Sequence, residues 1–468
     1  MKRRDFLKVS ALGAAAIAAP QVIPGSSLGL DNAVAPSERI TMGLIGCGDH
    51  GRGWNLSLMF DNPAQQVVAV CDVDHQRMEQ ARGLVNDFYN GKNKTENYDC
   101  KAYEDFRDLV NRKDIDAVDI VTPDHWHVLI SVFAMKAGKD VICEKPTLTI
   151  EEGRILSDTQ KKTKAVFQTA SENRSIDEYQ RIVAAVRNGK IGELKNIKVL
   201  LPAGLVDKGK IGGSFDVSEV PDFLDYEKWL GPAPVKPYIP ARVHYNWRWN
   251  LDYSGGSLTD WGSHMINLAQ WANNTDETGP VEVCGKGDFP DYTEVWNATP
   301  TFDIDYKYAN GVTMRVWTEV PGIKFEGSRG WILNRGWRGT TTASDDSLLT
   351  WEPGPDDESF TRKASVVGKS DASPITGKSM GGEHVDFTEN VKTRTLCYYT
   401  AECGHRNHTI AHLGNVSMKM DGAKLQWNPD KEVFEGDRAN EASESVFTKR
   451  PQRDPWTFAN VDSWINVG

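Results

Sequence analysis

The sequence has no excess of positive charge. Its 54 Lys and Arg residues are outnumbered by 65 Asp and Glu residues, which gives a formal net charge of −11 at neutral pH. A nucleic-acid-binding protein needs a basic face that meets the phosphates, so this balance argues against DNA or RNA as a partner. It favours a protein that binds a neutral or small molecule.

Long hydrophobic runs are also missing. No segment after residue 35 approaches the roughly 18 consecutive apolar residues that a membrane-spanning helix requires. Internal repeats are lacking, as are low-complexity tracts beyond the N-terminal region. We therefore expect no membrane span. At 468 residues the chain is long for a single core, and two or three domains are predicted.

The seven cysteines have neither the spacing of a metal site nor that of a disulfide framework. Their number is odd, and Cys71 and Cys143 lie in apolar runs typical of buried strands. This pattern indicates a protein that folds in a reducing compartment, and we expect no metal ion. The cysteines are at positions 47, 71, 100, 143, 284, 397 and 403.

The first 35 residues have the order of an export signal. A basic stretch at residues 2–4 precedes a mildly apolar stretch at residues 9–19 and a segment rich in Pro, Gly and Ser. The Arg3-Arg4 pair is typical of a twin-arginine signal, so we expect export to the periplasm or beyond. Cleavage after Ala18 and after Ala35 are both open, and a disordered basic tail is the alternative to a signal.

A glycine-rich motif stands between a predicted strand and a predicted helix. The apolar residues 40–45 indicate a buried strand, Gly46-Cys47-Gly48-Asp49-His50-Gly51 follows directly, and residues 54–60 have a helical pattern. This order is typical of a dinucleotide-binding Rossmann unit. We expect Gly46 to make the tight turn, Gly48 to let the backbone approach a pyrophosphate, and Gly51 to let the helix pack on the strand. The helix N-terminus would then face the phosphates.

A second predicted strand, residues 66–71, ends at Asp72. In a Rossmann unit an acidic residue about 20 positions after the glycines accepts hydrogen bonds from a ribose. Asp72 would also repel a 2′-phosphate, which favours NAD over NADP. Arg52 and Arg77 leave NADP open, because either side chain would reach a 2′-phosphate.

Two further loops are expected at the same crevice, because open parallel sheets bind ligands at the carboxyl ends of their strands. Residues 122–127 follow an apolar strand at 117–121, and Glu144 and Lys145 follow a strand at 140–143. No metal is predicted at the two histidines of the first loop, because a third ligand is not in view. The predicted cofactor-binding residues are Gly46, Gly48, Asp49, His50, Gly51, Arg52, Asp72, Thr122, Pro123, His125, Trp126, His127, Glu144 and Lys145.

These motifs resemble those of the Gfo/Idh/MocA oxidoreductases. The resemblance rests on the glycine motif, on Thr122-Pro123, on Glu144-Lys145-Pro146 and on the block from Ser254 to His264. It covers nearly all of the chain from Ile40 onward, and the exported, glucose-fructose oxidoreductase-like members are the most similar. The resemblance implies an α/β fold class, with an N-terminal Rossmann dinucleotide-binding domain followed by an α/β domain that contains a large open, mostly antiparallel sheet.

The pattern along the rest of the chain agrees with this fold. We expect the Rossmann domain at residues 36–165 and the substrate-binding and oligomerisation domain at residues 166–468. Asn310-Gly311 between two predicted strands indicates a hairpin turn. Helices are predicted at 151–163 and 179–188, and strands at 165–169, 194–201, 281–284, 301–308, 312–320 and 323–332.

Oxidising a secondary alcohol with NAD requires a base for the hydroxyl proton and a cation near the developing alkoxide. The resemblance implies a catalytic lysine at Lys145, which would act as a cationic donor or, with a lowered pKa, as an acid or base. It implies an acid/base pair at Asp260 and His264, whose spacing of four places both on one helical face. Asp260 would bind a sugar hydroxyl or orient the imidazole, and His264 would exchange the proton. The alternative is an N-cap Asp260 and a packed His264.

Aromatic and basic side chains before this block are candidates for sugar binding. Tyr245, Trp247 and Arg248 would stack on a sugar and donate to its hydroxyl groups, with a core or interface role as an equal alternative. The weaker candidates for substrate contact are His405 and the segment Ser171-Glu172-Asn173-Arg174, which follows the predicted strand at 165–169, with Asn173 and Arg174 as the chosen side chains.

The sequence therefore predicts an exported NAD(P)-dependent oxidoreductase that moves a hydride from or to a secondary alcohol of a sugar or glycoside. Free NAD is not expected outside the cytoplasm, so the cofactor would be tightly bound and recycled. The alternatives are an NAD-dependent glycosidase that acts by transient ring oxidation and elimination, and a non-catalytic sugar-binding protein. A large open sheet face favours a homodimer or homotetramer.

Overall fold

A computed structural model describes residues 34–91, 97–205, 213–360 and 382–466 of the chain. The predicted signal at residues 1–35 lies outside the described residues, apart from its last two. The chain divides into two compact units, Met1–Arg39 and Ile40–Gly468. In the described part of the first unit, η2 (Pro36–Glu38) is a 3₁₀ turn. The elements below all belong to the second unit.

Six parallel strands form the first sheet. Their order, β3-β2-β1-β4-β5-β6, is that of a doubly wound Rossmann sheet. The five strands predicted in this region are confirmed, and β3 is an additional short edge strand. The strands are apolar runs because helices cover both faces of the sheet. They are β1 (Ile40–Ile45), β2 (Gln65–Cys71), β3 (Lys101–Tyr103), β4 (Ala117–Ile120), β5 (Asp140–Glu144) and β6 (Phe167–Ala170).

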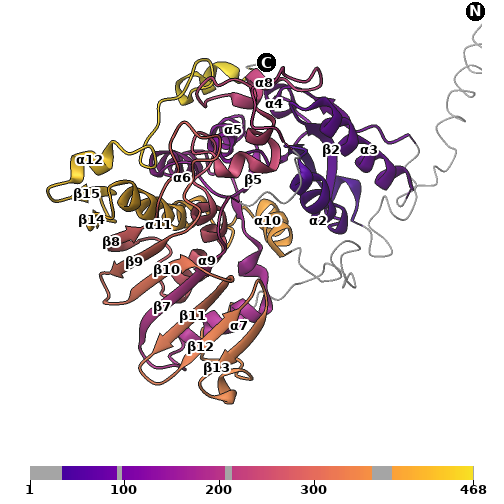
Figure 1. Ribbon diagram of the computed structural model, residues 1–468. Coiled ribbons are helices and arrows are strands. Elements are labelled where there is room, and N and C mark those ends of the chain that lie inside the picture. The colour runs from indigo at the N-terminus through magenta and orange to yellow at the C-terminus, as the bar shows by residue number, and fades with distance from the viewer. Residues whose placement is uncertain (1–33, 92–96, 206–212, 361–381, 467–468) are drawn as a thin grey trace, which may run out of the picture. The chain divides into compact units, whose positions relative to one another are not determined.

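The helices of this domain connect successive strands (Figure 1). They are η3 (Gly51–Asn55), α2 (Leu56–Asp61), α3 (His75–Gly91), α4 (Phe106–Val110), α5 (Asp124–Lys136) and α6 (Ile150–Thr163). The helix predicted at residues 54–60 begins earlier, at Gly51, as a π-helical turn that runs into α2. Asp105 caps α4 and Thr149 caps α6, since each side chain accepts a hydrogen bond from a backbone N–H of the first turn.

Nine strands form the second sheet. They are β7 (Leu194–Leu201), β8 (Pro280–Lys286), β9 (Asp303–Tyr308), β10 (Thr313–Thr318), β11 (Gly322–Gly327), β12 (Trp331–Arg335), β13 (Thr340–Ala343), β14 (Leu425–Asn428) and β15 (Val433–Glu435). The order is β13-β12-β11-β7-β10-β9-β8-β14-β15, in which β7 and β10 are parallel and the other pairs antiparallel. The predicted fold class, a Rossmann domain followed by an α/β domain with a large, mostly antiparallel sheet, is confirmed.

The prediction of one long strand at residues 323–332 was wrong. This segment belongs to the hairpin of β11 and β12, because Gly327 N donates to Gly330 O at 2.8 Å and reverses the chain. The turn predicted at Asn310-Gly311 is present between β9 and β10. Gly311 has φ +88° there, a conformation that favours glycine.

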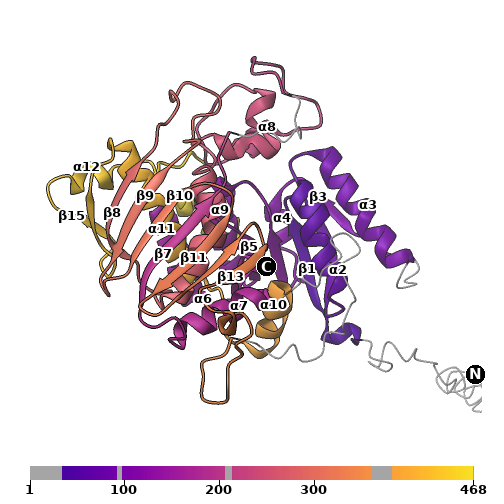
Figure 2. The same ribbon diagram turned by 60° about the horizontal axis from the view of Figure 1, so that its bottom comes forward.

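Helices cover one face of the nine-stranded sheet, whose strands run from magenta (β7) through orange to yellow (β15) in Figure 2. The helical elements that follow β6 are η4 (Glu172–Ser175), α7 (Asp177–Arg187), α8 (Tyr226–Leu230), η5 (Pro240–Arg242), η6 (His244–Trp249), α9 (Ser257–Ala272), η7 (Asp346–Leu348), α10 (Gly382–Thr393), α11 (Ala401–Lys419), α12 (Ala439–Ser443) and η8 (Phe458–Trp464). Of these, α10 packs on β5 and β6, and η8 packs on α5. α9 packs on β7, and α11 packs on β8 and on α9 around a shared apolar core. Along β9 and β10 buried residues alternate with exposed ones, so the opposite face of the sheet meets solvent.

Within the described ranges, no helix is both long and apolar enough to cross a membrane. No three His, Cys, Asp or Glu side chains gather there as metal ligands would. The seven cysteines all lie in the described part of the chain and form no disulfide bond with one another. Cys71 and Cys143 are buried in β2 and β5, as their apolar surroundings predict.

Candidate active site

The glycine motif forms the turn that the sequence predicts. Gly46 has φ +101°, and a Cβ atom there would lie 2.5 Å from the backbone carbonyl of Val121, so glycine is required. A Cβ atom on Gly51 would collide with the carbonyl oxygen of Gly46, because the helix approaches the strand so closely. At Gly48, by contrast, no atom of the described residues lies within 4 Å of a Cβ position. The backbone at Gly48 therefore borders an open space.

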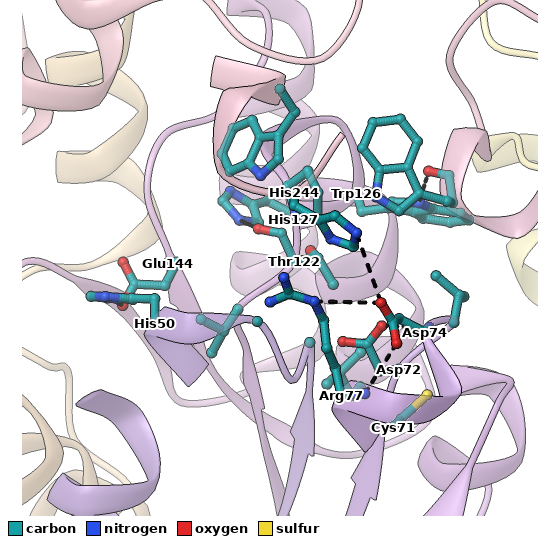
Figure 3. Close-up of a pocket in the computed structure, with 18 of the residues that line it drawn as sticks. His50, Cys71, Asp72, Asp74, Arg77, Thr122, Trp126, His127, Glu144 and His244 are labelled. Atoms are coloured by element: carbon teal, nitrogen blue, oxygen red, sulfur yellow. Dashed lines mark hydrogen bonds and ion pairs between the residues drawn. The ribbon is translucent and has the colours of Figure 1, made fainter. Parts of the chain in front are cut away.

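A cavity of about 480 Å³ lies at the carboxyl ends of β1, β2, β4 and β5 (Figure 3). This is the edge at which an open parallel sheet binds its ligand. Figure 3 shows His50 and Glu144 at one side of the cavity, and Asp74 and Trp126 at the other. Most of the predicted cofactor residues line the cavity, namely Gly46, Gly48, Asp49, His50, Asp72, Thr122, Pro123, Trp126, His127, Glu144 and Lys145.

Three predicted cofactor residues do not line it: Gly51, Arg52 and His125. Gly51 is buried beneath the turn. The Arg52 guanidinium donates to the carbonyl oxygen of Cys47 at 2.5 Å, and so supports the turn from within. His125 is buried, with Nε2 2.9 Å from the carbonyl oxygen of Trp229. These residues shape the walls of the cavity without facing it.

Asp72 is held by backbone groups at the end of β2. Its Oδ2 accepts from Cys47 N at 2.6 Å, and its Oδ1 accepts from Asp74 N at 2.8 Å. Burial raises the pKa of Asp72 to about 6, with these N–H donors working in the opposite direction. The carboxylate is therefore mostly ionised at neutral pH. Next to it, Arg77 lies 3.4 Å from Asp74 and 3.2 Å from Asp49, so the charge of Arg77 is shared between two other carboxylates.

These features fit a dinucleotide. The open space at Gly48 is what a pyrophosphate needs in order to approach the backbone, and a substituent on that residue would fill it. Asp72 supplies an ionised carboxylate at the position where a Rossmann unit meets a ribose. Gly46, Gly48 and Asp72 would hold the nucleotide, and Lys145 would face the reacting end of the cavity.

Lys145 and Asp260 form an ion pair at this cavity. Lys145 directly follows β5, Asp260 lies in the first turn of α9, and the Lys145 Nζ is 2.8 Å from the Asp260 Oδ1. Arg248 Nε lies 3.7 Å from Asp260 Oδ2. Burial disfavours the charge of Lys145, but Asp260 and Glu144 outweigh it and raise the pKa of the lysine. Burial also opposes the charge of Asp260, yet Lys145 and Arg248 hold its pKa well below the usual range. This pairing favours the charged form of the Lys145 amine.

His264 lies one helical turn after Asp260 and faces Ser171 and Glu172. Its Nδ1 is 3.0 Å from Ser171 Oγ and 3.7 Å from Glu172 Oε2. Burial, followed by the positive charge of Lys145, lowers the pKa of His264 to about 4, so the ring is neutral at pH 7. Both contacts are made by Nδ1, and no hydrogen bond to Nε2 is present among the described residues. A neutral imidazole with this arrangement is able to accept a proton.

Glu172, Trp337 and Arg338 belong to the same cluster. Glu172 lies in the segment predicted as a weaker substrate contact, whereas Trp337 and Arg338 were not predicted. Glu172 forms an ion pair with Arg338, and the Trp337 ring lies 5.0 Å from the His264 ring. The guanidinium carbon of Arg338 lies 4.8 Å from the centre of the Trp337 ring. A signal for Glu172 was available, because it follows the strand β6 at the ligand-binding edge of the sheet. Trp337 and Arg338 lie between β12 and β13, where no local motif marks them.

Glu144, the residue before Lys145, is fixed from two directions. Its Oε1 lies 3.0 Å from His50 Nε2 and 3.4 Å from the amide nitrogen of Asn55. The same amide donates to Asp119 Oδ2 at 3.1 Å. Burial opposes the charge of Glu144, but His50 and then Lys145 lower its pKa to about 2. A fixed negative charge therefore stands beside Lys145.

The predicted sugar-binding residues fall into two groups. Tyr245, Trp247 and Arg248 line the cavity from η6, next to the Lys145–Asp260 pair. The guanidinium carbon of Arg248 lies 4.3 Å from the centre of the Trp247 ring and 4.8 Å from that of the Tyr245 ring. The cavity wall therefore combines a positive charge with aromatic surface next to the Lys145–Asp260 pair.

Asn173, Arg174 and His405 do not line this cavity. Arg174 is 4% exposed and lies 2.6 Å from an Asp276 carboxylate oxygen. The Asn173 amide donates to the carbonyl oxygen of His264 at 3.1 Å. His405 is wholly buried, with Nε2 2.7 Å from a Glu432 oxygen. The structure gives all three side chains partners within the protein.

The protein has the doubly wound fold of a dinucleotide-binding oxidoreductase. Its parallel sheet carries a glycine turn that borders open space, and a lysine–aspartate pair lies beside a neutral histidine. Residues 40–171 match the sequence model of the oxidoreductase family's NAD-binding Rossmann fold, GFO_IDH_MocA. Residues 178–366 match that of the family's C-terminal alpha/beta domain. The chain belongs to the Gfo/Idh/MocA oxidoreductase family.

Three comparisons illustrate the relationship. The chain is 30% identical over 207 residues to a glycosyl hydrolase family 109 protein of Shewanella pealeana, which covers 42% of this chain and 44% of the relative. It is 29% identical over 240 residues to levoglucosan dehydrogenase of Pseudarthrobacter phenanthrenivorans, and the match covers 50% of this chain and 51% of the relative. A solved structure of levoglucosan dehydrogenase in complex with NADH and levoglucosan has a TM-score of 0.56 at 18% identity, covering 83% of this chain and 99% of that chain. The chain spans about half the length of the two curated relatives, and the structural likeness shows the fold.

Proposed function

We propose that this protein transfers a hydride between a tightly bound nicotinamide dinucleotide and a secondary alcohol of a sugar or glycoside. The observation that carries the proposal is the Lys145–Asp260 ion pair at 2.8 Å, in which Lys145 lines the same cavity as the glycine turn. The resemblance of the chain to levoglucosan dehydrogenase supports a sugar as the substrate.

The nicotinamide ring supplies the hydride acceptor when the cofactor is bound. His264 takes the hydroxyl proton of the substrate on Nε2, because the ring is neutral and both of its described contacts are on Nδ1. The ammonium group of Lys145 stabilises the negative charge that develops on the substrate oxygen. Asp260 holds that ammonium in place, and Tyr245, Trp247 and Arg248 bind the ring and its hydroxyl groups.

NAD is the favoured cofactor, with NADP as the alternative. The ionised carboxylate of Asp72 would repel a 2′-phosphate. Arg77, which lies near Asp72, already faces Asp49 and Asp74. Denaturing the purified protein and separating the released nucleotide by chromatography identifies the cofactor, and release of NADP would overturn this assignment.

The proposed activity is tested by an absorbance scan of the purified protein before and after addition of a panel of sugars and glycosides. Growth of a band near 340 nm, with the oxidised sugar found in the same sample, is the expected result. A protein purified without any nucleotide, to which neither NAD nor NADP binds, would contradict the proposal.

A glycosidase that works by transient oxidation is the second candidate. It would oxidise a ring carbon to a ketone, eliminate the aglycone, add water across the resulting double bond and then reduce the ketone, so that the cofactor is unchanged overall. The similarity to the glycosyl hydrolase family 109 protein favours this candidate. Release of aglycone without net growth at 340 nm would identify it. A non-catalytic sugar-binding protein is the third candidate, and binding of a sugar without either change would identify that.

Export and self-association complete the proposal. The twin-arginine pattern at Arg3-Arg4 favours transport of the folded, nucleotide-loaded protein to the periplasm. Changing both arginines to lysine in the producing cell should retain the protein in the cytoplasm, which fractionation would detect. The exposed face of the nine-stranded sheet favours a homodimer or homotetramer. Gel filtration that shows a monomer near 52.1 kDa would exclude that assembly.

A further inference from the structure

The end of the cavity next to Asp72 has walls that come from outside the nucleotide-binding domain. Carboxylates at the end of the second Rossmann strand meet the adenosine ribose, so this end would receive the adenosine half of a dinucleotide. Lys228 and Trp229 of α8 and Trp456 near the end of the chain line the cavity together with Phe106 of the nucleotide domain. Two segments far away in sequence therefore complete the adenosine end.

The first of these segments is joined to the loop that carries Asp72. Asp74 and Leu224 form an isolated antiparallel bridge. His75 N donates to Phe223 O at 2.8 Å, and Asp225 N donates to Val73 O at 2.9 Å. Backbone hydrogen bonds thus fix the start of α8 above the ribose-binding end of β2.

The second segment is the C-terminal strap, residues 450–466. The Trp456 ring lies 5.2 Å from the Trp126 ring and 5.8 Å from the Trp464 ring, and the Arg107 guanidinium carbon lies 4.8 Å from its centre. Trp456 therefore packs between the first turns of α4 and α5. Farther along the strap, the Asn111 amide donates to Trp464 O at 2.9 Å.

The strap also binds the first segment. Arg453 forms an ion pair with Glu227 of α8, and its Nε donates to Ala233 O at 3.3 Å. The indole N–H of Trp126 donates to Trp229 O at 3.2 Å. The strap, α8 and α5 are in this way tied to one another around the adenosine end. Figure 1 shows the yellow end of the chain beside α8 and α4.

We propose that the C-terminal strap is the device that retains the dinucleotide, with Trp456 as the residue that locks the aromatic wall of the adenosine pocket. This inference rests on the proposed function, since it requires a bound dinucleotide. In this proposal the Trp126–Trp456 packing and the Arg453–Glu227 pair hold the wall of the adenosine end in place and thereby slow the release of the nucleotide. A protein that recycles one cofactor in place requires such slow release.

The test compares nucleotide release from the full-length protein and three variants. Trp456→Ala removes the indole ring that the strap contributes to the adenosine end of the cavity. Arg453→Gln removes the ion pair between the strap and Glu227 of α8. Because this ion pair is partly exposed, folding should survive the second substitution. Trp427→Ala is the matched control, because Trp427 is also 4% exposed but packs on Phe434 in the second sheet. Nucleotide per chain is measured after denaturation. The release rate is measured by exchange of the bound nucleotide with an excess of radiolabelled NAD.

We expect release from Trp456→Ala to be at least about tenfold faster than from the wild type, which corresponds to about 1.4 kcal/mol. Nucleotide release from Arg453→Gln should also be faster than from the wild type, and release from Trp427→Ala should occur at the wild-type rate. Unchanged release from Trp456→Ala, or equal acceleration by Trp427→Ala, would overturn the role of the strap. If Trp456→Ala does not fold, unchanged release from Arg453→Gln overturns it. A wild-type protein without nucleotide contradicts the proposed function instead, so the two failures are distinguishable.

Discussion

The Lys145 ammonium lies 2.8 Å from the Asp260 carboxylate, whereas the imidazole of His264, one turn farther along the same helix, faces Ser171 and Glu172. The two groups of the predicted acid/base pair therefore have different partners. Asp260 fixes the cation, and Glu172 lies against the base. This division leads to separate expectations for each residue.

Lys145→Ala should retain the nucleotide and lose turnover. The substitution removes the cation that stabilises the developing alkoxide, and loss of such a donor lowers kcat on the order of 10²- to 10³-fold. Steady-state kinetics and nucleotide content of the same preparation check the prediction. Lys424→Ala, in an exposed pair with Glu282, is the control and should behave as the wild type. Near-normal turnover of Lys145→Ala would remove this residue from the mechanism.

The pH dependence of kcat/KM should report the low pKa of His264. Burial and Lys145 lower this pKa to about 4, so the imidazole is neutral and able to accept a proton at all pH values well above 4. Activity should fall as the pH decreases through about 4, because the base becomes protonated. Short assays with a return to neutral pH separate this effect from unfolding. An acid limb centred near 6.5, the ordinary value of histidine, would argue against the assignment.

Glu172→Gln tests whether Glu172 positions and tunes His264. The carboxylate raises the pKa of His264 against the effect of burial, so its removal should shift the acid limb to lower pH. kcat should also fall, because the substitution removes the ion pair with Arg338 that holds the side chain of residue 172 beside His264. Glu178→Gln, on the exposed side of α7, is the control. A Glu172→Gln enzyme with an unshifted pH profile would leave Glu172 with a structural role only.

Gly48→Ala and Gly46→Ala should fail in different ways. A methyl group at Gly48 meets no described atom within 4 Å, so the apo protein should melt as the wild type does while nucleotide content falls. A methyl group at Gly46 would collide with Val121 in a backbone of positive φ, and should destabilise the fold by about 1–3 kcal/mol. Thermal melting and nucleotide content, measured for both variants, separate these outcomes. Equal nucleotide content in Gly48→Ala and the wild type would mean that the open space is not the pyrophosphate site.

Local patterns were sufficient for much of the fold and the cofactor cavity. The glycine turn and Asp72 lie within one strand–turn–helix–strand unit, so their roles follow from chain geometry. Ser171 to Arg174 shows the limit, because the sequence marks the segment but not which of its side chains faces His264. On a 3₁₀ turn the direction of each side chain depends on packing, and the structure directs Glu172 rather than Arg174 toward His264.

Tertiary packing decides the remaining differences. His405 lies on α11, and its burial against Glu432 depends on how that helix docks. From the turn between β12 and β13, Trp337 reaches His264 and Arg338 reaches Glu172, and no sequence period marks either contact. The hairpin of β11 and β12 was missed although a signal was present. Gly327-Ser328-Arg329-Gly330 interrupts the apolar pattern with turn-forming residues.

Trp456 lies about 400 positions after the glycine turn, yet it stands in the wall of the same cavity. The nucleotide site is therefore assembled from contacts of very high sequence separation, which form late because a long loop must close first. During synthesis the N-terminal sheet emerges and folds before the strap exists. A nascent chain would then bind the dinucleotide loosely, and capture would follow only once the last segment had docked.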